Sequence, residues 1–166
     1  MKEASLASRV KLRFGIVTPS RARLRFLPAM ARQVRDQSCQ DWDWVYVHDG
    51  PSPAAARSLL RQAAGDPRIH YLEMEQPGED WGWSPRVAGI RQLAKLPRPP
   101  EYVAMWDDDD AFHSDALESI RGELEKNNWP DLLLVPVRGG AGVLPVQNKS
   151  VADLGPGEVC TLHLIA

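Results

Sequence analysis

The sequence predicts an α/β domain built on a central, mostly parallel sheet with helices on both faces. Short apolar runs alternate along the chain with segments whose apolar residues recur every three or four positions. That alternation is typical of parallel strands joined by covering helices. No repeat or linker divides the 166 residues, a length that suits one domain. We therefore expect residues 1–11 to be a frayed polar lead-in and residues 12–166 to form a single domain.

Three predicted strands lie in the first half of the chain, at residues 12–18, 44–47 and 69–72. Pro19 is expected to close the first strand, because proline has no amide hydrogen to donate to a ladder. Two helices are expected between the strands, on the apolar faces formed by Leu24, Leu27, Ala31 and Val34 and by Ala56, Leu59, Leu60 and Ala63. Ser52 is a natural N-cap for the second helix, with Pro53 at its first position and Gly65 at its end.

The second half continues the alternation. Val87, Ile90 and Leu93 mark a helix that Pro97 stops. The apolar strand Tyr102–Trp106 follows, and then a helix that Ser114 can cap, with an inner face of Leu117, Ile120 and Leu124. Further strands are expected at residues 132–137 and 159–165, with a flexible turn at residues 139–142 between them.

The charge, the number of cysteines and the apolar runs of the sequence exclude several classes of protein. A net charge of −2 and a pI of about 6.1 argue against a nucleic-acid binder, which usually has a strongly basic face. Cys39 and Cys160 are too few for a disulfide framework and are expected to be reduced thiols. The sequence contains no apolar run of membrane-spanning length and no apolar core of a secretory signal near its start, so the expected location is cytoplasmic.

Four consecutive aspartates, Asp107–Asp110, are the most informative feature. They follow the most apolar predicted strand, and ligands of open parallel sheets bind beyond the carboxyl ends of the strands. If the segment is extended, Asp107 and Asp109 point the same way and can face one hard cation, such as Mg²⁺ or Mn²⁺, or one cation and a ribose. The alternative is an acidic surface loop.

Four segments resemble family-two glycosyltransferases over roughly residues 12–126. Tyr102–Leu117 (YVAMWDDDDAFHSDAL) resembles the metal motif of that family, with Ser114 in place of the usual proline. The other three segments are GIVTPSRAR from Gly15, VYVHDGPS from Val45 and GWSPRVAGI from Gly82. Gln37 stands where a glutamine is common, whereas His48 and Val87 replace a usual aspartate and a usual asparagine.

The resemblance implies a GT-A fold, like that of nucleotide-diphospho-sugar transferases, and a metal-dependent, inverting sugar transfer. The donor would be a UDP-, GDP- or dTDP-linked sugar, and the acceptor stays unknown. The metal, Mn²⁺ or Mg²⁺, would be held by Asp107 and Asp109. The matched donor-binding residues are Thr18, Pro19, Arg21, His48, Asp49, Arg86, Asp107 and Asp108. For Asp49 alone, fixing a tight turn before Gly50 is an equal reading, and for Arg86 a surface helix position is the alternative.

The resemblance does not identify a catalytic base, so the catalytic residue is unknown; Asp110 and Glu158 are the first to consider. Family members continue into an acceptor-binding half, so we expect this chain to be truncated before it and to transfer sugar poorly. Two alternatives remain: a non-catalytic nucleotide-sugar-binding module and a nucleotidyltransferase. The second is disfavoured because residues 18–23 contain arginines but no glycine. Trp81 and Trp83 either stack on a sugar ring or pack in the core or a lid.

Overall fold

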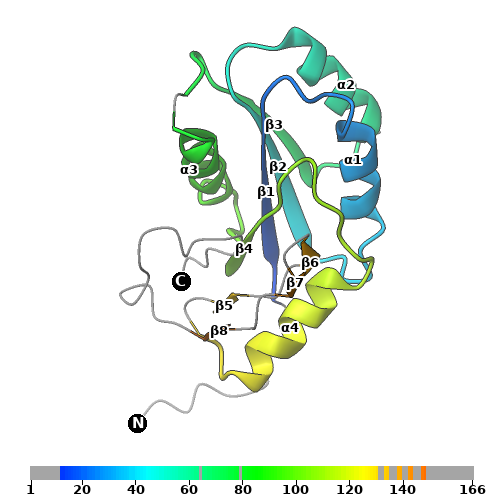
Figure 1. The fold of residues 1–166 in the computed structure, drawn as a ribbon, viewed down its shortest axis with the longest axis vertical. Helices are drawn as coiled ribbons and strands as arrows, with labels where there is room; N and C mark the ends of the chain where they lie inside the picture. Colours follow the sequence, from blue (N-terminus) through cyan, green and yellow to red (C-terminus); the bar gives the residue numbers. More distant parts are fainter. Residues whose placement is uncertain are drawn as a thin grey trace.

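The computed structural model describes residues 12–130 except 64 and 79, with Leu60 as backbone only, and the backbone of four short strands between residues 133 and 148. Figure 1 shows a central sheet with helices against it and short strands outside it. The predicted lead-in at residues 1–11, the strand at residues 159–165, Glu158 and Cys160 lie outside the described residues.

Four parallel strands form the central sheet in the order β3-β2-β1-β4. They are β1 (Phe14–Ser20), β2 (Trp42–His48), β3 (Ile69–Glu73) and β4 (Tyr102–Met105). Phe14 pairs with Trp42 on one side and with Tyr102 on the other, so the three strands begin in register and end at the same edge. The predicted parallel sheet is confirmed.

Four two-residue strands follow: β5 (Leu133–Leu134), β6 (Arg138–Gly139), β7 (Gly142–Val143) and β8 (Gln147–Asn148). β5 pairs with β8 and β6 with β7, both antiparallel. The middle of the turn expected at residues 139–142 lies outside the described residues, and of the strand expected at residues 132–137 the structure describes residues 133–134 as a strand.

Helices cover both faces of the sheet, as predicted (Figure 1). One face of β2 carries Trp42, Trp44 and Tyr46, which are buried with apolar residues of α1 (Leu27–Arg35), α2 (Pro53–Ala63) and α4 (Ala116–Lys126). The other face carries Val45 and Val47, which pack with residues of α3 (Trp83–Leu93). Because side chains alternate along a strand, two separate cores result. Within the described part of the chain, no helix is long and apolar enough to cross a membrane.

Gly89 lets α3 lie unusually close to the sheet. A β-carbon at this position would stand 2.5 Å from Val17 Cγ1 and 3.1 Å from Val47 Cγ2. Contacts this short would force the helix away from β1 and β2. The glycine therefore fixes the distance between the sheet and α3, whose first turns lie at the carboxyl edge of the strands.

Three local predictions are corrected by the structure. β1 continues through Pro19 to Ser20. The backbone of Val17 faces β4, where its carbonyl accepts from Trp106 N at 3.0 Å, so Pro19 two residues later faces the same side beyond the end of β4. A proline costs no hydrogen bond there. Helix α1 starts at Leu27 rather than Leu24, because Leu24 lies in a preceding turn.

Ser114 does not cap α4, whose N-cap residue is Asp115 without a side-chain bond. Gln37, which is 1% exposed, replaces it: its Oε1 accepts from Leu117 N at 3.1 Å and its Nε2 donates to His113 O at 2.8 Å. A residue from the end of α1 thus satisfies the first turn of a distant helix. The predicted Ser52 cap is confirmed by a bond from Ala55 N to Ser52 Oγ at 3.2 Å.

Candidate functional site

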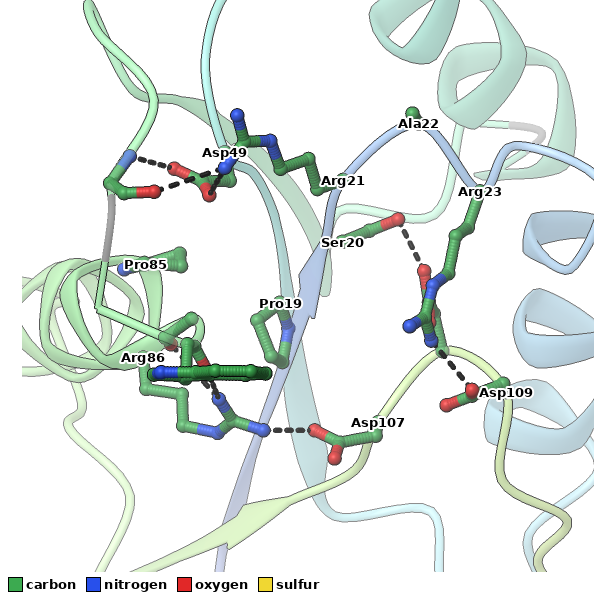
Figure 2. A pocket seen from close by; sticks show the side chains of 14 residues that line it. Pro19, Ser20, Arg21, Ala22, Arg23, Asp49, Pro85, Arg86, Asp107 and Asp109 are labelled. Atoms are coloured by element: carbon green, nitrogen blue, oxygen red, sulfur yellow. Dashed lines mark hydrogen bonds and ion pairs between the residues drawn. The ribbon is translucent and has the colours of Figure 1, made fainter.

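A polar cleft of about 640 Å³ opens at the carboxyl edge of the sheet. Its volume is within the usual range for small-molecule sites. Figure 2 shows side chains from the ends of three strands and from the first turns of α3 pointing into it. The lining residues are Pro19, Ser20, Arg21, Ala22, Arg23, Asp49, Gly78, Trp81, Gly82, Pro85, Arg86, Asp107, Asp108 and Asp109.

The aspartate run forms a turn rather than an extended segment. Asp107 O accepts from Asp110 N at 3.2 Å, which closes the turn. Asp107 Oδ1 lies 2.5 Å from Arg86 Nη2, and Asp109 Oδ2 lies 2.5 Å from Arg23 Nη1. The expected extended backbone is therefore wrong, although both carboxylates line the same cleft. Each of them is held by a different arginine, as Figure 2 shows.

Asp108 faces inward between them. It is 5% exposed, accepts a short hydrogen bond from Ser20 Oγ and lies 3.4 Å from Arg23 Nη1. Burial raises the pKa of this carboxyl above its ordinary value, against the opposing effects of Ser20 and Arg23. The pKa of Asp110 is also raised, first by burial and then by the negative charges of Asp107 and Asp109. The acidic turn thus has four carboxyl groups, and the arginines that contact it are Arg23 and Arg86.

Asp49, which follows β2, fastens the loop that precedes α3. Its Oδ1 accepts from Gly78 N at 2.7 Å, and Arg21 Nη1 donates to Gly78 O at 3.0 Å while lying 3.7 Å from Asp49 Oδ2. Gly50 has a left-handed φ of +93° and so turns the chain directly after Asp49. Asp49 thus holds a neighbouring loop through Oδ1. It also lines the cleft, where its Oδ2 faces Arg21.

Two of the predicted donor-binding residues do not line the cleft. Thr18 is fully buried, and its Oγ1 accepts from Trp44 Nε1 at 2.9 Å. His48 is buried with its Nδ1 2.8 Å from Gly50 O. Both side chains are engaged inside the protein, and a role in donor binding stays a prediction for them. The other predicted residues, Pro19, Arg21, Asp49, Arg86 and Asp107–Asp109, come together in the cleft.

Two side chains that hold the acidic turn, Ser20 and Arg23, are not among the site residues predicted from the sequence. Both stand in the quoted segment GIVTPSRAR, directly after the first predicted strand. A parallel sheet brings the carboxyl ends of its strands to one edge. The position of this loop directly after a predicted strand could therefore have indicated that it lies at the site. The choice of Arg23 as the partner of Asp109 depends on the path of the loop, which includes Ala22 in a left-handed conformation (φ +55°).

The fold and the cleft define an α/β domain with a polar cleft of small-molecule size beyond the ends of its parallel strands. Residues 15–142 match the model of the family described as Glycosyl transferase family 2. The chain therefore belongs to this family. No protein of curated function matches the sequence.

Solved structures of S. aureus TarS are similar in fold. One TarS structure aligns with a TM-score of 0.65 and 16% identity over 79% of this chain, but over only 22% of its own length. TarS 1-349 in complex with UDP-GlcNAc aligns with a TM-score of 0.62 and 16% identity over 81% of this chain and 37% of that one. The likeness confirms the GT-A fold, and the chain spans less than two fifths of these proteins.

Proposed function

We propose that this chain forms the nucleotide-sugar donor site of a glycosyltransferase. The observation that carries the proposal is the cleft in which Arg21, Arg23 and Arg86 alternate with carboxylates at the carboxyl edge of a family 2 domain. Guanidinium groups suit diphosphates, because they donate paired hydrogen bonds and stay charged. Solved complexes of TarS with UDP and with UDP-GlcNAc, proteins of the same fold, support this class of ligand.

The donor would lie along the cleft with its nucleoside near Asp49 and its diphosphate near Arg86. Asp49 can accept a hydrogen bond from a base or a ribose through the carboxylate oxygen that faces Arg21. Arg86 reaches the acidic turn from α3 and is mostly buried, which distinguishes it from a surface helix arginine. Diphosphate oxygens placed there would be met by Arg86 on one side and Arg23 on the other.

The acidic turn suits a divalent cation whose coordination would be completed by the phosphates of the substrate. The side chains of Asp107 and Asp109 are 38% and 45% exposed. Among the described residues, no group of three or more His, Cys, Asp or Glu side chains is placed to hold a metal. Mg²⁺ is typically bound by one or two carboxylates together with substrate phosphates and water. Asp107 and Asp109 would hold Mn²⁺ or Mg²⁺ in this way, and the bound ion would stabilise the departing nucleoside diphosphate.

The chain's own arginines have a second part in this proposal. Without donor, Arg86 and Arg23 neutralise Asp107 and Asp109. If Asp107 and Asp109 held a cation, it would supply positive charge at these carboxylates, and Arg86 and Arg23 would be available to bind the diphosphate. Positive charge is then fixed where negative charge develops on the leaving group, which lowers the barrier of sugar transfer. Inversion at the anomeric carbon, the base and the acceptor stay predictions from the family resemblance.

Calorimetry with UDP, GDP and dTDP tests the proposal, each with Mn²⁺ and with a chelator. We expect one nucleotide to bind with Mn²⁺ and at least tenfold more weakly without it. Asp109→Asn should lose the dependence on Mn²⁺, because it removes one charged ligand and keeps the size of the side chain. Asp115→Asn is the matched control, since Asp115 pairs with His113 outside the cleft. Unchanged affinity and metal dependence in Asp109→Asn would exclude this carboxylate as a ligand.

A donor-binding protein without activity is the alternative function. Release of free sugar from the donor that binds best separates the two, because slow hydrolysis by water needs the donor site but no acceptor. We expect the protein to hydrolyse the donor faster than buffer alone does. Asp107→Asn should abolish this increase. Tight binding without any hydrolysis or transfer would favour the non-catalytic module.

A further inference from the structure

Trp81 lies on the rim of the cleft and is 99% exposed. Indole is a large apolar group, and a fully hydrated one loses the stabilisation that its burial would provide. Among the described residues that line the cleft, it is the sole aromatic side chain. Its position indicates a surface that is completed by a ligand.

The backbone holds Trp81 in this position. Its φ is +58°, a left-handed conformation that non-glycine residues rarely adopt, and Gly82 continues with a φ of +80°. Asp80 fastens the loop on the other side, because its Oδ2 accepts from Ser84 N at 2.9 Å and its carbonyl accepts from Trp83 N at 3.2 Å. A strained conformation kept by bonds on both sides is typical of functional positions.

The contacts of this loop place Trp81 along the proposed donor. Three residues before it, Gly78 donates to Asp49 at the proposed nucleoside end. The carbonyl of Trp81 itself accepts from Arg86 Nη1 at 3.2 Å, and the same guanidinium binds Asp107 at the diphosphate end. Trp81 therefore belongs to the segment that runs from the proposed nucleoside end of the cleft to the proposed diphosphate end. In the proposed donor pose, the transferred sugar would lie beyond the diphosphate, on the side away from Asp49.

We propose that Trp81 stacks on the nucleobase of the donor, an inference that rests on the proposed function. A flat aromatic base matches the face of an indole, and proteins that bind single-stranded nucleic acids use aromatic side chains in this way, whatever the base. Pro19 adds an apolar surface between Asp49 and Asp107, as Figure 2 shows. Asp49 would then read the edge of the base while Trp81 covers its face.

The test compares ligands with and without a base on three variants. In the presence of Mn²⁺, Trp81→Ala should weaken the preferred nucleoside diphosphate about tenfold and leave the affinity for inorganic pyrophosphate unchanged, whereas Trp81→Phe should recover most of the loss. Trp83→Ala is the matched control, because Trp83 is partly exposed on the same segment and does not line the cleft. Indole fluorescence should be quenched by the nucleotide in wild type and in Trp83→Phe, but not in Trp81→Phe.

Each other result has a distinct meaning. Equal losses for pyrophosphate and nucleotide would overturn stacking and leave Trp81 a loop-positioning residue. A loss for the nucleotide sugar but not for the nucleoside diphosphate would assign the indole to the sugar instead. If wild type binds nucleotide and Trp81→Ala binds it equally, the inference fails alone. If wild type binds no nucleotide, the proposed function fails and the inference with it.

Discussion

Arginine and aspartate side chains meet at both edges of the same sheet, with opposite consequences. At the amino edge, Arg13 contacts Asp43 and Asp41. At the carboxyl edge, Arg23 and Arg86 contact the acidic turn. The two clusters contain the same chemical groups, but the carboxylate of Asp43 is buried whereas those of Asp107 and Asp109 are partly exposed.

The amino-edge cluster is closed. Asp43 lies on β2 with its side chain 5% exposed, and it is bonded to Arg13 before β1 and to His70 of β3 at 3.3 Å. Burial alone would raise the pKa of Asp43, but the hydrogen bonds and charges of His70 and Arg13 outweigh it and hold the pKa below its ordinary value. This cluster ties the starts of three strands together around the buried carboxylate of Asp43.

The carboxyl-edge cluster is open. Arg23, Asp107 and Asp109 are each more than a third exposed, and the pKa values of Asp108 and Asp110 are raised rather than lowered, mainly by burial. Charges in such a cluster are incompletely balanced and can exchange partners at little cost. An arginine–aspartate pair is thus buried where strands enclose it, and it stays exposed, at the proposed donor site, where the strands have ended.

The largest expected effect is on stability at the amino edge. Asp43→Asn should lower the free energy of unfolding by about 3 kcal/mol, because Arg13 and His70 would lose the buried carboxylate that both contact, and Arg13 would keep only its longer contact with Asp41. Urea denaturation followed by circular dichroism measures it. Asp109→Asn is the counterpart at the open edge, and similar losses in both variants would break the comparison.

Arg86→Gln should have the next largest effect, on binding rather than stability. Removing a charge-assisted contact costs about 1.5 kcal/mol, so nucleoside diphosphate affinity should fall roughly tenfold in calorimetry. Arg68→Gln is the control, because Arg68 pairs with Asp66 outside the cleft. An affinity that Arg86→Gln leaves intact would show that the diphosphate lies elsewhere.

The pH dependence of stability should separate the two edges further. Because the folded-state pKa of Asp43 is lowered, its contribution is present above the unfolded value, about 3.9, and is lost as pH falls through the folded value. Thermal melts between neutral and acid pH should therefore show a smaller acid-induced loss for Asp43→Asn than for wild type. Parallel melting curves of the two proteins would contradict this account.

The smallest effect is expected for Arg23→Gln. Arg23 is half exposed, so its pair with Asp109 should contribute no more than about 0.5 kcal/mol to folding. Its melting temperature should stay within error of wild type while nucleotide affinity drops. A marked destabilisation would mean that this edge too is structural.

Much of the fold could be predicted from local pattern. Strand and helix order follow from apolar periodicity, and the aspartates were placed at the carboxyl edge because they come directly after a buried strand. The errors fall where a distant segment takes over a local task. Gln37 caps α4 in place of Ser114, and Pro19 stays inside β1 because β4 has already ended beside it.

What the sequence by itself determined is which residues could carry charge to one edge of the sheet. Only the tertiary structure decided which of them meet. Arg23 reaches Asp109 across a separation of 86 residues, and Arg86 reaches Asp107 across 21. The physical reason is that strand order and register are set by packing between distant segments: β1 pairs with β4, and Gly89 lets α3 approach closely enough to bring Arg86 to the acidic turn.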